Sequence, residues 1–135
     1  MITGIEHFAV VTTDVEKAAA FYKDLLGFRE RGRLQTTHSG TIIFITLGGT
    51  ELELFGGGTI APKPEGRAVG YTHIALTVDD IDSDYERIST RGVEFTMKPT
   101  TVESGMRIAF FAYCSFPLSR YANAQVRMSF ARSPM

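Results

Sequence analysis

The chain of 135 residues contains a single cysteine, Cys114, and no tryptophan. One cysteine excludes a disulfide framework within the chain and indicates a reducing, cytoplasmic location. No apolar run approaches the roughly 20 residues that a membrane-spanning helix needs, and the first residues lack the basic and apolar segments of an export signal. A formal net charge of −1 argues against nucleic acid as the main partner. We therefore expect a small soluble cytoplasmic protein that acts on neither a membrane nor a nucleic acid.

Acidic residues are absent from the last part of the chain. All fifteen Asp and Glu residues lie within residues 1–103, whereas residues 104–135 contain none. The same last segment holds four arginines: Arg107, Arg120, Arg127 and Arg132. The composition therefore changes near the end of the chain.

Two segments of the chain repeat one pattern at an offset of 66 residues. Residues 4–10 match residues 70–76, and His7 aligns with His73. The same offset aligns the two aspartates that precede the amphipathic segments, Asp14 and Asp80. An aspartate at this place accepts hydrogen bonds from the free amides of a first helical turn. Two copies of one supersecondary unit therefore organise the chain.

Apolar periodicity and turn residues predict the elements of each copy. In the first copy we expect a strand, a helix and three strands, over residues 5–12, 15–26, 28–35, 41–47 and 51–55. In the second copy we expect a strand, a helix and two strands, over residues 72–78, from residue 81, and over 93–97 and 106–113. A fourth strand is not recognisable there. The predicted fold class is α+β.

Ionisable side chains gather on one face of three predicted strands, because side chains alternate between the faces of a strand. His7 and His73 each share a face with small or polar neighbours, and Glu53 shares a face with Glu51, while the opposite faces are aliphatic. Two imidazoles and one carboxylate are an adequate ligand set for Zn²⁺, Ni²⁺, Mn²⁺ or Fe²⁺. If a pseudo-twofold axis relates the copies, the two histidines face each other, and we predict a metal site at His7, Glu53 and His73.

Each of these residues also has an ordinary structural interpretation. A single histidine on a strand is more often a hydrogen-bonded structural residue than a ligand. Glu51 and Glu53 are also typical charges of an edge strand. The repeat-matched pair of histidines favours the metal site over these interpretations.

Two other polar groups are interpreted as structural. His38 lies in a predicted turn among Thr, Ser and Gly and is expected to be solvated. The acidic run within residues 79–84 is typical of the start of a helix and its exposed face, which the helix dipole favours.

Four segments of the chain resemble the glyoxalase/bleomycin-resistance/extradiol-dioxygenase group, the vicinal oxygen chelate superfamily. They are the strand at 5–10, the helix at 15–28 with its Phe-Tyr…Leu-Gly-Phe pattern, and the strands at 51–55 and 72–76. The resemblance covers about residues 3–111. It implies two βαβββ modules that form a curved mixed sheet around a cleft within a single domain, with boundaries at 3–56 and 70–111 and a linker over 57–69.

The resemblance also implies a metal held by one histidine on the first strand of each module and a glutamate on the last. Carried over to this chain, the ligands are His7, Glu53 and His73, and Glu53 is the catalytic residue that moves a proton. The implied activity is that of a metal-dependent lyase or isomerase like lactoylglutathione lyase, which stabilises an enediolate formed from a small carbonyl compound or thiol adduct. A homodimer that completes the cleft is also implied.

The chain departs from the family pattern after residue 111. The second glutamate of the family falls near Leu118 or Ser119, and neither side chain suits a metal ion. Together with the loss of acidic residues, this indicates an atypical C-terminal end over residues 112–135, which a shift of reading frame near residue 112 would explain. A genuine tail would leave either a three-ligand site completed by water or a fold that no longer binds metal.

Two other functions stay open. Two histidines and one carboxylate are also the ligand set of Fe²⁺-dependent ring-cleaving dioxygenases. A metal-free protein that binds a drug or metabolite, as bleomycin-resistance proteins do, needs none of the three ligands. For a carboxylate ligand the sequence offers several arginines without distinguishing among them: Arg29, Arg31, Arg33 and Arg67.

Overall fold

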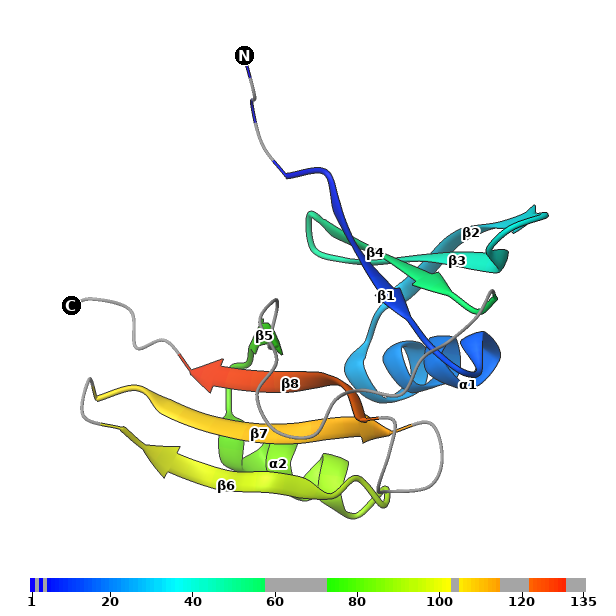
Figure 1. Cartoon of the computed structure of the whole chain (residues 1–135). Helices are drawn as coiled ribbons and strands as arrows, with labels where there is room; N and C mark the ends of the chain where they lie inside the picture. Colours follow the sequence, from blue (N-terminus) through cyan, green and yellow to red (C-terminus); the bar gives the residue numbers. More distant parts are fainter. Residues whose placement is uncertain (2, 4, 58–72, 103–104, 115–121, 131–135) are drawn as a thin grey trace. The chain divides into compact units, whose positions relative to one another are not determined.

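The computed structural model describes residues 1, 3, 5–57, 73–102, 105–114 and 122–130, with the backbone alone described for 112–114 and 122–130. The chain divides into two compact units, Met1–Pro62 and Lys63–Met135. In its described residues, each unit contains one four-stranded sheet and one helical segment (Figure 1). No helix among the described residues has the length and apolarity needed to cross a membrane.

The first unit has the predicted strand–helix–strand–strand–strand order. Its elements are β1 (His7–Val11), α1 (Val15–Ala20), the π-helical turn η1 (Phe21–Leu25), β2 (Arg29–Thr36), β3 (Gly40–Leu47) and β4 (Thr50–Phe55). The strand order is β1-β4-β3-β2, and β1 runs parallel to β4 while the other pairs are antiparallel. The sheet is therefore mixed, as expected.

The helical segment of the first unit has the predicted ends. Asp14 caps it by accepting a hydrogen bond of 3.0 Å from the amide of Lys17. At the other end Gly27 has a φ of +79°, the left-handed conformation in which glycine commonly ends a helix. The change from α-helix to π-helix at Phe21 has no counterpart in the sequence pattern.

The core of the first unit lies between the helical segment and one face of the sheet. Ile43, Ile45, Leu52 and Leu54 are at most 1% exposed, and α1 packs on the two strands that carry them. Figure 1 shows α1 along this side of the sheet. The residues that alternate with these four along β3 and β4 lie on the opposite face of the sheet, which we call the helix-free face. They are Ile42, Phe44, Thr46, Glu51, Glu53 and Phe55.

The second unit repeats the topology of the first. Its elements are β5 (His73–Thr77), α2 (Ile81–Ser89), β6 (Phe95–Thr101), β7 (Arg107–Cys114) and β8 (Ala122–Phe130). The strand order is β5-β8-β7-β6, with β5 parallel to β8. Asp80 caps α2, as predicted, and Ile81 and Ile88 are buried.

One strand prediction for the second unit is wrong, and one strand was not recognised in the sequence. β6 continues through Pro99 instead of ending at Met97, because it is an edge strand with a register shift at this place, where a proline is tolerated. A fourth strand, β8, pairs with both β5 and β7. Its alternation of apolar and polar residues was the available signal in the sequence.

Candidate functional site

His7 and Glu53, two of the three predicted metal ligands, lie next to each other on the helix-free face. They stand on the neighbouring parallel strands β1 and β4, whose register pairs His7 with Glu51 and Ala9 with Glu53. The His7 Nε2 atom is 3.5 Å from the Glu53 Oε2 atom. The sheet therefore brings an imidazole and a carboxylate to one point.

This pair suits a divalent metal ion. Ligand atoms about 2.1 Å from one ion stand about 3.0–3.4 Å from each other at right or tetrahedral angles, close to the 3.5 Å between His7 Nε2 and Glu53 Oε2. His7 Nδ1 forms a hydrogen bond with the carboxylate of Glu6, and metal-bound histidines commonly donate a hydrogen bond to a carboxylate through their second nitrogen. His7 and Glu53 therefore fit as two ligands of a single ion.

Three carboxylates make the surroundings of His7 negative. The hydrogen bond that His7 donates to Glu6 raises the pKa of the imidazole most. Burial opposes this rise, and the charges of Glu53, Glu6 and Glu51 add to it. Carboxylates that stabilise a proton on His7 also stabilise a divalent cation bound there. Protons and metal ions therefore compete for this histidine.

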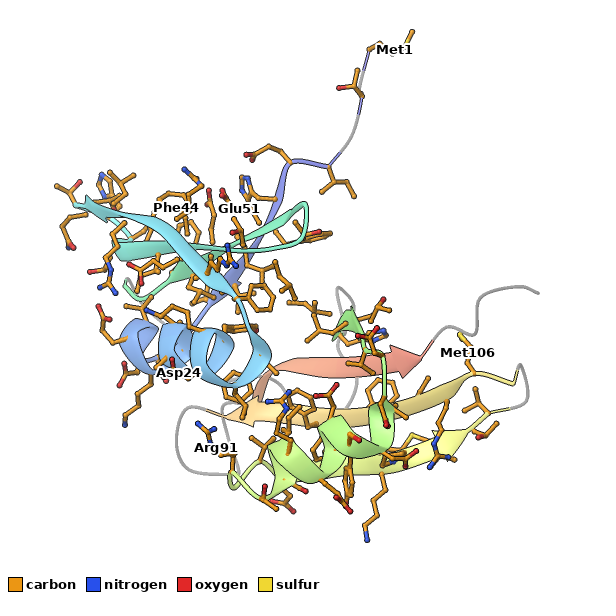
Figure 2. All side chains as sticks on the ribbon, turned by 180° about the vertical axis from the view of Figure 1, so that it is seen from behind. Met1, Asp24, Phe44, Glu51, Arg91 and Met106 are labelled. Atoms are coloured by element: carbon orange, nitrogen blue, oxygen red, sulfur yellow. The ribbon has the colours of Figure 1, made fainter. Side chains whose placement is uncertain are left out.

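Glu51, the register neighbour of His7, is paired with an arginine. Arg31 Nη2 donates to Glu51 Oε1 at 2.9 Å and Arg31 Nε donates to Glu51 Oε2, which lowers the pKa of the Glu51 carboxyl. Figure 2 shows Glu51 and Phe44 on one side of the first sheet and Asp24 of the helical segment on the other. Within the described part of the chain, Glu53 has no hydrogen bond from an arginine.

The third predicted ligand, His73, is the first residue of β5 in the second unit. Its ring makes an edge-to-face contact with Phe110 at a centroid distance of 5.7 Å. No group of three His, Cys, Asp or Glu side chains that suits a metal ion occurs among the described residues. The three-ligand metal centre stays a prediction. The first sheet brings two of its predicted ligands together, His7 and Glu53.

The register of the second sheet identifies the counterpart of Glu53. Ala75 stands opposite Arg127 in the pairing of β5 with β8, as Ala9 stands opposite Glu53 in the pairing of β1 with β4. An arginine therefore holds the register position where a second glutamate was expected. The two residues named for this place from the sequence lie outside the described residues: Leu118 and Ser119.

The remaining polar groups named from the sequence have the structural roles that were predicted. His38 is exposed in the turn between β2 and β3. In the acidic run, Asp82 pairs with Arg107 and Asp84 pairs with Arg87, each at 2.7 Å.

The arginines that the sequence did not distinguish have different partners in the structure. Arg33 is bonded to Glu16 and Glu30, whereas Arg31 is bonded to Glu51 on the helix-free face. Arg67 lies outside the described residues. The signal for this difference was Gly32, a residue that weakens a strand and often marks a bulge.

Known proteins share this sequence pattern. The model of the Glyoxalase/Bleomycin resistance protein/Dioxygenase superfamily matches residues 4–115. The ethylmalonyl-CoA/methylmalonyl-CoA epimerase of Cereibacter sphaeroides is 35% identical over 102 residues, which cover 68% of this chain and 73% of that protein.

Solved structures share the fold. The fosfomycin resistance protein FosX of Listeria monocytogenes, complexed with Mn(II) and sulfate, has a TM-score of 0.70 at 23% identity and covers 98% of this chain and 95% of its own. TnmS3, an antibiotic-binding protein from Streptomyces sp. CB03234, has a TM-score of 0.71 at 22% identity and covers 97% of this chain and 98% of its own. The predicted α+β fold with mixed sheets is confirmed.

Proposed function

Since the chain belongs to the glyoxalase/bleomycin resistance protein/dioxygenase superfamily, we propose that it is a divalent-metal-dependent isomerase or lyase that moves a proton on a carbon next to a carbonyl group. The observation that carries this proposal is the 3.5 Å approach of His7 Nε2 to Glu53 Oε2 on the helix-free face. An imidazole and a carboxylate at this separation suit both the binding of a cation and the transfer of a proton.

In this proposal His7, Glu53 and His73 hold the ion, and Zn²⁺, Ni²⁺, Mn²⁺ and Fe²⁺ are the candidates. The ion, when bound, polarises the carbonyl oxygen of the substrate and makes the neighbouring C–H group acidic. Glu6 orients the His7 ring through its hydrogen bond with Nδ1, which leaves Nε2 as the atom that would bind the metal ion. The place of His73 in this set rests on the repeat.

Glu53 is the proposed catalytic base. Glu51 is bonded to Arg31 through both of its oxygens, and its lowered pKa makes it a weak base. Glu53 approaches His7 with one oxygen, and a carboxylate has a second oxygen for the proton. Its side chain is 17% exposed, so that it is shielded from most of the solvent.

The proposed substrate is an acyl thioester with a carboxyl group on the carbon next to the thioester carbonyl. The support is the 35% identical relative, named for ethylmalonyl-CoA and methylmalonyl-CoA. The hydrogen between two carbonyl groups is acidic, and its removal from one side and return to the other inverts the carbon. The lactoylglutathione lyase type of reaction expected from the sequence moves a proton by the same chemistry.

The test is exchange of the C2 hydrogen of methylmalonyl-CoA for deuterium in D₂O, measured by mass spectrometry. The full chain with one of the four metals is expected to catalyse the exchange, and EDTA should abolish it. His7→Ala, His73→Ala and Glu53→Gln should each lower the rate about 100-fold or more. His38→Ala is the matched control and should leave the rate unchanged. The proposal is wrong if no metal supports exchange, or if His7→Ala exchanges at the wild-type rate.

A metal-free binding protein is the second candidate, favoured by the fold shared with TnmS3, which is named as an antibiotic-binding protein. Elemental analysis of the purified full chain separates the two. Negligible metal content, unchanged by His7→Ala and His73→Ala, would support the binding protein.

A cytoplasmic homodimer belongs to the same proposal. β1 is an edge strand, and on it Phe8 is 41% and Val11 51% exposed, as suits an interface. The single cysteine supports the cytoplasmic location. Sedimentation equilibrium should give twice the chain mass, and Val11→Glu should shift the protein to the monomer, whereas a wild-type monomer would contradict the dimer.

A further inference from the structure

We propose that Arg31 binds an anionic group of the substrate through the edge of its guanidinium that Glu51 leaves open. For the thioester proposed above, this group is the carboxylate. The identity of the ligand rests on the proposed function, whereas the placement of Arg31 rests on contacts of its own.

A β-bulge turns Arg31 toward the helix-free face. β2 pairs with β3 at Glu30–Ile45 and next at Gly32–Phe44, so that Arg31 is an extra residue between the two pairs. Because the strand gains one residue here, Arg31 can lie on the same face as Phe44. Bulges often re-aim a side chain next to a functional site.

Gly32 places no side chain beside Phe44. It is the register partner of Phe44, and apart from its chain neighbours no residue has an atom within 4 Å of the place where its Cβ would be. Arg31 Cζ lies 4.8 Å from the centroid of the Phe44 ring. Stacking on an aromatic ring fixes the plane of a guanidinium.

The contact with Glu51 uses one edge of the guanidinium. Nε and Nη2 donate to the two oxygens of Glu51, which accounts for two of the five N–H groups of an arginine. No partner for the other three is found among the described residues. They include a second pair of parallel N–H groups, on Nη1 and Nη2, which matches the two oxygens of a carboxylate. The Arg31 side chain is 56% exposed, so a ligand can reach this edge.

An anionic substrate needs a cation on this face. Glu6, Glu51 and Glu53 together would repel it. Arg31 feels the charges of all three, which raise its pKa, Glu51 most. Arg31 therefore lies within electrostatic range of the proposed base and ligand Glu53, and offsets the repulsion at the place where the substrate would bind.

The other described arginines of β2 lack this arrangement. Arg33 is bonded to Glu16 and Glu30. Arg29 pairs with Thr46 in the register and shares the helix-free face, but it has no ion pair or ring contact among the described residues. Arg29 is therefore a matched control, with the same charge on the same strand and face.

The test compares methylmalonyl-CoA with propionyl-CoA, which lacks the carboxylate. Isothermal titration calorimetry is done on the full chain with Mn²⁺ and again in EDTA, so that binding of the carboxylate by metal is separated from binding by Arg31. Wild type should bind methylmalonyl-CoA about tenfold more tightly or better. Arg31→Gln should lose this preference under both conditions and keep its affinity for propionyl-CoA, and Arg29→Gln should keep the preference.

Two further variants separate a binding role from a structural one. Arg31→Lys keeps the charge but not the parallel N–H groups, and should regain only part of the preference. Phe44→Leu removes the stacking and should weaken the preference, with circular dichroism as the check on folding. In deuterium exchange, Arg31→Gln should raise KM and leave kcat nearly unchanged.

The inference is overturned if Arg31→Gln keeps the preference, if Arg29→Gln loses it equally, or if wild type has none. Deuterium exchange measures the proposed function separately. If wild type prefers methylmalonyl-CoA over propionyl-CoA but does not exchange the C2 hydrogen, only the proposed function is contradicted. If wild type exchanges the C2 hydrogen without this preference, only the role of Arg31 is contradicted.

Discussion

The imidazole of His7 and the carboxylate of Glu53 lie 3.5 Å apart on neighbouring parallel strands. Strand alternation and the pairing of His7 with Glu51 put both on the helix-free face, and the carboxylates around them favour positive charge on His7. The same place can therefore hold a proton or a metal ion, and the ion can be detected by what it does to stability.

Metal binding should raise the melting temperature of wild type. A ligand at 100 times its Kd adds about 2.7 kcal/mol to the free energy of unfolding, which corresponds to a rise of roughly 10 °C for a chain of this size. His7→Ala and His73→Ala should abolish the rise, and His38→Ala should keep it. Differential scanning fluorimetry with and without Mn²⁺ or Zn²⁺ measures it. A full rise in His73→Ala would contradict a site shared by both units.

Lowering the pH should reduce the free energy of unfolding of the first unit, because Glu30 becomes protonated. Its carboxylate lies between Arg33 and Lys23, which lower the pKa of Glu30 from 4.5 to about 2. Because the folded pKa is below the unfolded one, this stabilisation is complete above about pH 4.5 and disappears as the pH falls toward 2.

Glu30→Gln should therefore lower the free energy of unfolding by about 1 kcal/mol at pH 7, with no difference from wild type at pH 2. Urea denaturation over a pH series measures this. Glu86→Gln, on the exposed face of α2, should change stability by less than about 0.5 kcal/mol. A difference for Glu30→Gln that does not depend on pH would contradict the role of the charge.

The backbone at Gly57 lies so close to the backbone of Ser39 and Gly40 that there is no room for a side chain. A Cβ at this position would lie 2.5 Å from the carbonyl oxygen of Ser39 and 2.7 Å from the amide nitrogen of Gly40. Gly57→Ala should therefore destabilise the chain by about 1–3 kcal/mol. Gly49→Ala is the control, because no atom lies within 4 Å of its Cβ position. Thermal and urea unfolding compare the two, and equal stability would contradict the clash.

Local signals in the sequence predicted most of the elements. Asp14 and Asp80 mark two helix starts and Gly27 marks a helix end, because capping depends only on nearby backbone. β8 was missed although Val126 and Met128 alternate with polar residues, since the strand begins later than the repeat predicts. The family match ends at residue 115, before β8. A change of reading frame near residue 112 stays a hypothesis.

The candidate site was predictable only in part. Alternation puts His7 and Glu53 on one face, but the pairing of β1 with β4 decides their distance. The role of Arg31 depends on a bulge that arises from the pairing of β2 with β3. The predicted convergence of His73 with the pair would depend on the arrangement of two units, which no local pattern encodes.

Position 127 tests whether the second sheet contributes to the metal site as the first does. Arg127 stands opposite Ala75 as Glu53 stands opposite Ala9. Arg127→Glu would give the second module the carboxylate of the first. It should tighten Mn²⁺ binding about tenfold or more, because an added carboxylate ligand raises affinity for a hard divalent cation.

The control for this variant is Gln125→Glu, since Gln125 pairs with His73 as Glu51 pairs with His7. It adds a carboxylate on the same strand without occupying the counterpart of Glu53, so its effect on Mn²⁺ affinity should stay within about twofold. Titration calorimetry measures both variants. Equal tightening by both would assign the effect to charge rather than to ligand position. No tightening by Arg127→Glu would mean that the register counterpart of Glu53 does not reach the ion, and that the fourth place belongs to water or substrate.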